Sequence, residues 1–183
     1  MALWSDRPMT DTPASLGLPQ TRLALAPHDP AWAEAFEREA ARIRLALSRT
    51  AVEIDHIGST AVPGLPAKPI LDIAVRVGPQ DEQRVATALT TLGYVDRGIR
   101  SGRLFVRMAG GDVRTHNLHL YRPDDPDCRD QIAFRDRLRA DAGLRARYAA
   151  LKEDLVRQLG DAGRGRYADG KTDFVKAAIR RDA

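Results

Sequence analysis

The first long hydrophobic pattern in the chain repeats every three or four residues. Its apolar positions are Trp32, Phe36, Ala40, Ile43 and Leu47. This spacing places the side chains on one face of a helix. Asp29 followed by Pro30 is a favourable start, because Asp caps the first N–H groups and Pro fits the first helical turn. We therefore predict an amphipathic helix over residues 29–49, with its apolar stripe in the core.

Shorter apolar runs, rich in β-branched residues, follow this helix and predict strands. Two of them, residues 52–57 and 70–77, flank a loop that contains several prolines. A second pair, residues 103–108 and 113–121, is joined by the sequence AGGD, which is typical of a hairpin turn. Alternation along a strand decides which side chains share a face. It groups Arg103 with Phe105 and Arg107, and it groups Thr115 with Asn117 and His119.

Helical patterns dominate the rest of the chain. They cover residues 81–92, 127–141, 144–159 and 172–181, and a short edge strand is predicted at residues 21–26. Strands early and helices late favour an α+β (mixed α/β) fold, with a helical C-terminal part and with helices packed on one face of the sheet. Residues 1–20 lack periodicity and predict a flexible leader. Residues 21–183 then form a single domain.

The composition narrows the class of protein. Of the 183 residues, 43% are hydrophobic and 30% are charged, which is typical of a soluble, folded protein. No apolar run is long enough to span a bilayer, and the first residues lack the apolar core of a signal peptide. The single cysteine, Cys128, excludes an internal disulfide. We therefore expect a protein of the reducing cytoplasm.

The net charge of +4 is concentrated in the last part of the chain. From residue 129 onward, 14 Lys and Arg stand against nine Asp and Glu. Such a surplus can attract a phosphorylated ligand. Because acids interrupt the bases and aromatic residues make up only 5%, we expect neither a nucleic-acid interface nor a membrane partner.

The candidate site lies where the strand of residues 52–57 enters the proline-containing loop. Gly58 allows the backbone to approach an anion, and the N–H groups of Ser59 and Thr60 can point at a phosphate. Asp72 sits in the next strand among apolar neighbours, which leave its carboxylate few other uses. We therefore predict an anion and metal site, and hence the active site, within residues 52–77.

Two strings in this stretch resemble the signature of a known family. Residues 55–65, DHIGSTAVPGL, and residues 68–73, KPILDI, are similar to the GrpB family, also called UPF0157, of the nucleotidyltransferase superfamily. The likeness extends over residues 22–180. Later segments that also resemble the family are Asn117-Leu118-His119, and Tyr167 with Lys171 and Phe174.

The resemblance implies a nucleotidyltransferase fold, a small mixed sheet flanked by helices. It implies that Gly58 and Ser59 hold nucleotide phosphates, and that two acids two residues apart on the next strand bind Mg²⁺. Asp72 matches the first acid, but Ala74 stands at the second position and cannot bind metal. This departure weakens the case for a two-metal site. The residues that could supply the missing ligand are Glu53, Asp55 and His119.

The main hypothesis is a nucleotidyltransferase-like enzyme, which binds a nucleoside triphosphate with Mg²⁺ and transfers a nucleotidyl group to an unidentified small-molecule acceptor. Asp72 would hold the metal, and His119 would serve as ligand or proton carrier. The phosphate contacts would come from Gly58, Ser59, Thr60, Lys68, Arg103 and Arg107, with His56, Asn117 and Lys171 in supporting positions.

Two other functions fit the same residues. One is a nucleotide- or phosphometabolite-binding module that has lost catalysis, which Ala74 favours. The other is a metal-dependent enzyme of different chemistry, with a transition metal held by His56, Asp72 and His119. Structural interpretations also exist: Asp72 could form an ion pair, and His56 could orient the turn. The sequence does not determine the acceptor, the preferred nucleotide or the oligomeric state.

Overall fold

The structure is a computed structural model, and it describes residues 15–47, 50 and 52–180. The strands and helices predicted for residues 52–180 are confirmed, with small differences in their bounds. In chain order the elements are β1 (Leu18–Pro19), α1 (Ala31–Ala46), β2 (Glu53–Ile57), η1 (Ser59–Ala61), β3 (Leu71–Arg76), α2 (Glu82–Thr91), β4 (Val95–Arg100), β5 (Gly102–Met108), β6 (Val113–Tyr121), α3 (Pro126–Ala140), α4 (Ala142–Leu159), η2 (Asp161–Arg166), η3 (Asp169–Lys171) and α5 (Thr172–Arg180).

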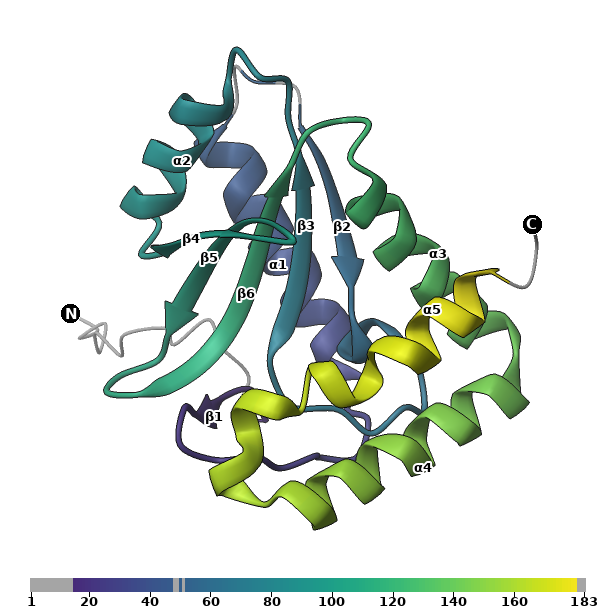
Figure 1. Cartoon of the computed structure of the whole chain (residues 1–183). Coiled ribbons are helices and arrows are strands. Elements are labelled where there is room, and N and C mark those ends of the chain that lie inside the picture. Colours follow the sequence, from purple (N-terminus) through teal and green to yellow (C-terminus); the bar gives the residue numbers. More distant parts are fainter. Residues whose placement is uncertain (1–14, 48–49, 51, 181–183) are drawn as a thin grey trace, which may run out of the picture.

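The strands form one mixed sheet. Its order is β2-β3-β6-β5-β4, and the short β1 pairs with the start of β6. Strands β3 and β6 run parallel, whereas the other paired strands are antiparallel. Parallel neighbours need a long connection, and here α2 and the β4–β5 hairpin provide it. This mixed sheet with flanking helices (Figure 1) confirms the predicted α+β class.

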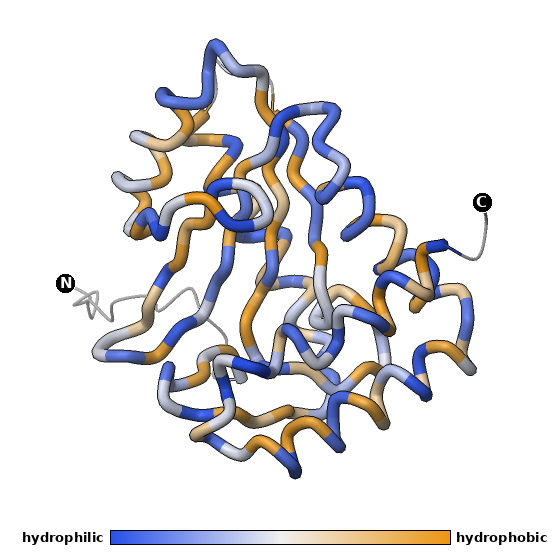
Figure 2. The backbone as a smooth tube through the Cα atoms, in the orientation of Figure 1, coloured by the Kyte–Doolittle hydropathy of each residue, from blue (hydrophilic) through white to orange (hydrophobic). Residues whose placement is uncertain are grey.

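One face of the sheet is covered by α1 and α2. The apolar stripe predicted for the first helix is buried in full, and it packs against Leu71, Ile73 and Val75 of β3. Burying each large apolar side chain stabilises the fold by about 1.5–3 kcal/mol, so this cluster is the main core. Figure 2 shows the hydrophobic colour running along the central strands.

The opposite face of the sheet is covered by α3. Ile57, Ala74 and Tyr121 form an apolar patch on this face, against Cys128 of α3. The prediction that the helices pack on one face of the sheet is therefore wrong. Strands β2, β3 and β6 carry apolar side chains on both faces, and each face requires its own helical cover.

Helices α3, α4 and α5 pack together beside the sheet. Their apolar cluster includes Phe134, Tyr148 and Ala178, and it also buries Val62 and Leu65 from the loop between β2 and β3. The C-terminal helices thus fix the loop that follows the predicted site. None of the helices in the described part of the chain is long and apolar enough to cross a membrane.

The N-terminal boundary of the domain differs from the prediction. The sequence predicts a leader over residues 1–20, but the Gly17 N–H donates to the Pro69 carbonyl at 2.8 Å, and β1 pairs with β6. Residues 1–14 lie outside the described residues. The edge strand predicted at residues 21–26 is wrong, because the pairing there is an isolated bridge from Ala26 to Ala67.

Candidate functional site

A sharp turn at Gly58 joins β2 to the short helix η1. Gly58 has φ +70°, a left-handed conformation that residues with a side chain rarely adopt. Because Ile57 pairs with Asp72 across the β2–β3 ladder, this turn lies beside the Asp72 carboxylate. A Cβ atom on Gly58 would lie 2.4 Å from Asp72 Oδ2. Glycine is therefore required both for the backbone conformation and for the close approach of the carboxylate.

Asp72 is held from its other side by Asn117. The two residues pair in the parallel β3–β6 ladder, and Asn117 Nδ2 donates a hydrogen bond to Asp72 Oδ1 at 2.8 Å. Asn117 Oδ1 in turn accepts a hydrogen bond from Arg114 Nη1 at 3.4 Å. This relay orients the carboxylate, with Oδ2 toward the Gly58 turn.

Asp72 lines a pocket of about 460 Å³ between the sheet and helices α3 and α5. Gly58, Ser59 and His119 also line it, as does Tyr148 of α4, whose side chain hydrogen-bonds to that of Ser59. The helices contribute the apolar side chains of Phe134, Leu138, Val175 and Ile179. Charged side chains also line it, namely Asp127, Asp130, Arg135, Lys171 and Lys176, so the wall is mixed and suits a charged small molecule.

His119 presents a defined nitrogen to this pocket. Its Nδ1 lies 2.8 Å from the carbonyl oxygen of Ser101, which can only accept a hydrogen bond. Nδ1 therefore carries the proton in the neutral ring, and Nε2 keeps a lone pair. The ring stacks on Tyr121 with centroids 5.9 Å apart, which limits its rotation. His119 can accept a proton at Nε2 or bind a cation there.

Two lysines lie near Asp72 and share one aromatic ring. Lys68 Nζ is 4.9 Å and Lys171 Nζ is 4.5 Å from the centroid of the Tyr167 ring. Burial, opposed in part by the charge of Asp72, lowers the pKa of Lys68. Burial and the charge of Lys68 lower the pKa of Lys171 to about 8. Of the two, Lys171 lines the pocket, and Lys68 approaches from the loop between β2 and β3.

His56 and Thr60 lie behind the turn. The His56 ring stacks on Phe36 of α1 with centroids 4.6 Å apart, and its Nε2 lies 3.0 Å from Thr60 Oγ1. Burial, together with nearby arginine charges, lowers the pKa of His56 to about 3, so the ring is neutral. Both side chains are buried, and their contacts agree with the structural interpretation of His56 as a residue that orients the turn.

The prediction of a transition-metal site formed by His56, Asp72 and His119 is wrong. His56 pairs with Ile73 and Asp72 pairs with Ile57, so alternation places His56 on the α1 face and Asp72 on the α3 face. Within the described ranges, no group of three or more His, Cys, Asp or Glu side chains could hold a metal ion. A single carboxylate, Asp72, is left at the predicted metal position.

Arg103 and Arg107 also lie on the face opposite Asp72. Arg107 Nη1 is 2.5 Å from Glu39 Oε2, a buried carboxylate of α1. Arg103 Nη2 is 2.6 Å from Asp96 Oδ2 of β4. These acids neutralise both arginines on the side that α1 and α2 cover. The structure thus corrects the prediction that they contact phosphates at the Gly58 turn.

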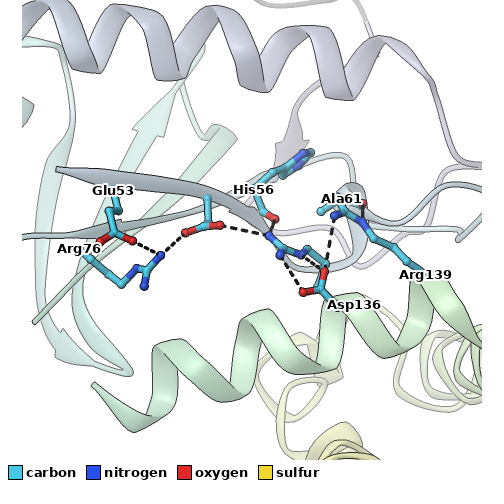
Figure 3. Close-up of polar contacts among 8 residues, drawn as sticks. Glu53, His56, Ala61, Arg76, Asp136 and Arg139 are labelled. Atoms are coloured by element: carbon cyan, nitrogen blue, oxygen red, sulfur yellow. Dashed lines mark hydrogen bonds and ion pairs between the residues drawn. The ribbon is translucent and has the colours of Figure 1, made fainter. Parts of the chain in front are cut away.

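The acids of β2 pair with arginines of β3 and α3 (Figure 3) and do not line the pocket. Arg76 Nη2 lies 2.6 Å from Glu53 Oε2 and 2.9 Å from Asp55 Oδ2. Arg135 of α3 reaches Asp55 Oδ1 at 3.5 Å and donates to the His56 carbonyl at 2.9 Å. The prediction that Glu53 or Asp55 replaces the missing acid is therefore wrong.

The position of the missing acid is hydrophobic. Ala74 is fully buried, with Ile57, Tyr121 and Cys128 around it. It pairs with His119 in the β3–β6 ladder, and His119 lines the pocket. His119 is thus the one predicted replacement that reaches the pocket.

Arg114 is a residue near Asp72 that strand alternation does not predict. Counting back from Asn117 places Arg114 on the opposite face. The β5–β6 ladder is irregular, however: Arg107 pairs with His116, and Met108 then pairs with Arg114. This β-bulge turns Arg114 toward Asn117. A bulge of this kind has no clear signature in a single sequence, so only the structure reveals the residue.

The mixed sheet, with a Gly-Ser turn facing an acid on the adjacent strand, has a nucleotidyltransferase-like fold. The fold is similar to that of the Cid1 poly(U) polymerase in a crystal structure with Mg 3′-dATP bound. The TM-score is 0.51 at 14% identity, over 74% of this chain and 45% of that chain. At this identity the likeness concerns the fold alone.

Residues 22–181 match the family described as GrpB protein, and the chain belongs to this family. A UPF0157 protein of Streptomyces coelicolor is 38% identical over 93% of this chain and 90% of its own length. The UPF0157 protein YqkA of Bacillus subtilis is 34% identical over 87% of this chain, which spans 47% of that relative. The crystal structure of the conserved protein GrpB from Enterococcus faecalis has a TM-score of 0.73 at 28% identity, over 86% of this chain and 98% of that one.

Proposed function

We propose that this protein binds a nucleoside triphosphate in the pocket at Asp72 and transfers a nucleotidyl group to a small-molecule acceptor. The observation that carries the proposal is the contact between the Gly58 turn and the Asp72 carboxylate. It brings an anion-binding backbone and a cation-binding acid to one point. The nucleotidyltransferase-like fold supports the class of ligand.

The chain supplies several groups for such a transfer. An acceptor oxygen would form a bond to the α-phosphorus while the bond to the oxygen bridging to the β-phosphate breaks, so that pyrophosphate leaves. The N–H groups after Gly58 and the ammonium group of Lys171, which lines the pocket, would neutralise the phosphates. His119 Nε2 would take the proton from the acceptor hydroxyl.

The donor set at Asp72 fits one Mg²⁺ ion. Magnesium is usually bound by one or two carboxylates together with substrate phosphates and water. Asp72 Oδ1 already accepts from Asn117, and Oδ2 lies at the Gly58 turn, so this carboxylate would hold the ion with the phosphates. When bound, Mg²⁺ would offset the charge of the phosphates. Ala74 supplies no ligand for a second ion.

A second candidate function follows from Ala74. Because its neighbours are apolar, the place of the second acid has been incorporated into the packing beneath α3. This favours a nucleotide- or phosphometabolite-binding module without catalysis. A metal-dependent enzyme of other chemistry would need further ligands around Asp72.

Calorimetric titration with ATP, GTP, CTP and UTP, each with and without Mg²⁺, tests the binding step. We expect Mg²⁺-dependent affinity for at least one of them, and no affinity for any of them would refute the proposal. Pyrophosphate release in a screen of small-molecule acceptors then separates the two candidates. Binding without release across the screen supports the binding module. We expect this pocket to bind neither a nucleic acid nor a membrane. We expect the protein itself to lie in the cytoplasm.

A further inference from the structure

Three cations lie close enough to one another and to Asp72 for their charges to interact, and the pocket lining does not include them. They are Lys68 of the loop after η1, Arg114 of β6 and Arg164 of η2, and we call them the basic cluster. All three are half-buried. They come from segments far apart in the sequence, so the fold itself has brought like charges together.

The basic cluster differs from three half-buried arginines that pair with acids. Arg76, Arg107 and Arg135 each have a carboxylate within 4 Å. In the described part of the chain, no carboxylate forms an ion pair with Lys68, Arg114 or Arg164. Arg114 donates instead to the amide oxygens of Gln20 and Asn117, and its buried Nε has no hydrogen-bond partner there.

Burial lowers the pKa of Arg164, although the charge of Asp112 acts on it in the opposite direction. Burial and the charge of Arg164 lower the pKa of Arg114 and that of Lys68. Asp72 is a nearby acid that acts on both groups in the opposite direction. Half-buried cations that repel one another are stabilised when an anion binds among them.

The cluster and the pocket meet at Asp72 from different sides. Along β6, Arg114 precedes Asn117 and His119 follows it, while Asp72 pairs with Asn117. Of the two outer residues, His119 lines the pocket. Arg114 reaches Asp72 through the Asn117 amide. A ligand in the pocket and an anion on the cluster would therefore approach the same carboxylate from opposite ends.

We propose that the basic cluster is a second anion subsite, which holds a phosphate group of the acceptor. The acceptor is then a phosphorylated small molecule, and its reactive oxygen is brought to the nucleotide at Asp72. This inference rests on the proposed function, and it adds the class of acceptor. Three half-buried cations in a compact group suit one phosphate group, whereas an extended strand of nucleic acid needs a longer basic track.

The probe is inorganic phosphate, titrated into the full chain by calorimetry at constant ionic strength. Titrations are made without nucleotide, and again with saturating Mg²⁺ and a non-hydrolysable ATP analogue. The test variants are Arg114→Gln and Arg164→Gln. Arg84→Gln and Arg129→Gln remove the same charge from exposed helical positions and serve as controls.

We expect phosphate to bind the wild-type chain in the presence of the analogue. The affinity for phosphate should fall at least about tenfold in each test variant, which is the loss of one charge-assisted hydrogen bond, and it should stay unchanged in the controls. In Arg164→Gln the affinity for the analogue itself should change by less than about twofold, because its phosphates lie on the other side of Asp72. Arg114→Gln also removes the hydrogen bond to Asn117, which orients Asp72, so this variant is judged by its phosphate affinity without nucleotide.

Two results would overturn the inference. In the first, phosphate binds the test variants as well as it binds the wild type, or it does not bind at all. In the second, Arg164→Gln loses affinity for the analogue and for phosphate alike, which would assign the cluster to the nucleotide. If the analogue fails to bind the wild type, the proposed function fails, and the titrations without nucleotide still report on the cluster.

Discussion

Gly58 lies so close to Asp72 that any side chain at position 58 would collide with the Asp72 side chain. A Cβ atom there would lie 2.4 Å from Asp72 Oδ2 and 2.8 Å from Asp72 Cβ. The end of β2 and the acid of β3 therefore form one rigid unit. A displacement of the turn must displace the carboxylate.

Gly58→Ala is expected to impair both stability and ligand binding. The backbone conformation of Gly58, with φ +70° and ψ −171°, costs about 1–3 kcal/mol for a residue with a side chain. The clash should in addition displace Asp72 and reduce the affinity for Mg²⁺ and nucleotide at least about tenfold. Urea unfolding and calorimetric titration measure the two effects.

Gly64→Ala is the matched control for this substitution. Gly64 has φ +77°, and a Cβ atom there would have nothing within 4 Å. Gly64→Ala should therefore lower the free energy of unfolding by a similar amount and leave the affinity for nucleotide unchanged. Equal affinities of the two variants would show that the contact at Asp72 does not position the ligand.

Asp72→Asn should remove the Mg²⁺ dependence of nucleotide binding and leave the fold intact. The new amide can still accept a hydrogen bond from Asn117, but it carries no charge for the cation. Titration with and without Mg²⁺, together with thermal unfolding, gives both readouts. Asp127→Asn, at an exposed position that lines the same pocket, is the control. A Mg²⁺-dependent affinity that survives in Asp72→Asn would exclude Asp72 from the site.

Ala74→Asp restores the superfamily pattern in sequence but should destabilise this protein. The new carboxylate would be buried against Ile57, Tyr121 and Cys128, where water is excluded. We expect a loss of more than about 2 kcal/mol in the free energy of unfolding, whether or not Mg²⁺ is present. Ala74→Val, which adds volume without charge, separates the effect of packing from that of charge. Recovery of stability upon addition of Mg²⁺ would instead indicate a preserved two-metal geometry.

The stability of the protein should rise with pH between about 7 and 9, with Lys152 as a main cause. Its side chain is fully buried and donates to the Pro66 carbonyl, and burial lowers its pKa to about 7 from the ordinary 10.5. Below pH 7 both the folded and the unfolded chain hold this proton, so the cost of the buried charge is complete. Above pH 7 the folded chain releases the proton while the unfolded chain retains it, and the cost disappears.

Lys152→Met tests this account. Urea unfolding from pH 7 to pH 9 should show a smaller slope in the variant, with a remainder from Lys171, whose pKa is lowered in the same direction. Lys176→Met, at an exposed position, should keep the wild-type slope. Slopes that are identical in the wild type and in Lys152→Met would mean that Lys152 is charged in the folded chain throughout this range.

Much of the candidate site could be predicted from local sequence. Gly58 and Ser59 form a turn because glycine alone permits the backbone conformation, and Asp72 lies on a strand whose apolar neighbours mark it as buried. Both are properties of short segments. The faces assigned to Asn117 and His119 also follow from strand alternation, and the β3–β6 pairing brings them to Asp72.

Other assignments depended on partners that are distant in sequence. Arg107 does not contact a phosphate at the Gly58 turn because it forms an ion pair with Glu39 of α1. Asp55 forms an ion pair with Arg135 of α3. The alternation pattern predicts on which face of the sheet these side chains lie, but it does not predict which helix covers that face. The missing second acid was visible as Ala74, whereas the apolar packing around it was not.

The amino-acid sequence by itself determined most of the helices and strands, the turn at Gly58 and the family, because each depends on residues that are close along the chain. Only the tertiary structure decided that helices cover both faces of the sheet, that His56 lies on the far side from Asp72, and that a bulge turns Arg114 toward Asn117. The order of the strands, their register and the packing of the helices bring together residues that are far apart in the sequence. These contacts decide which charged groups surround Asp72.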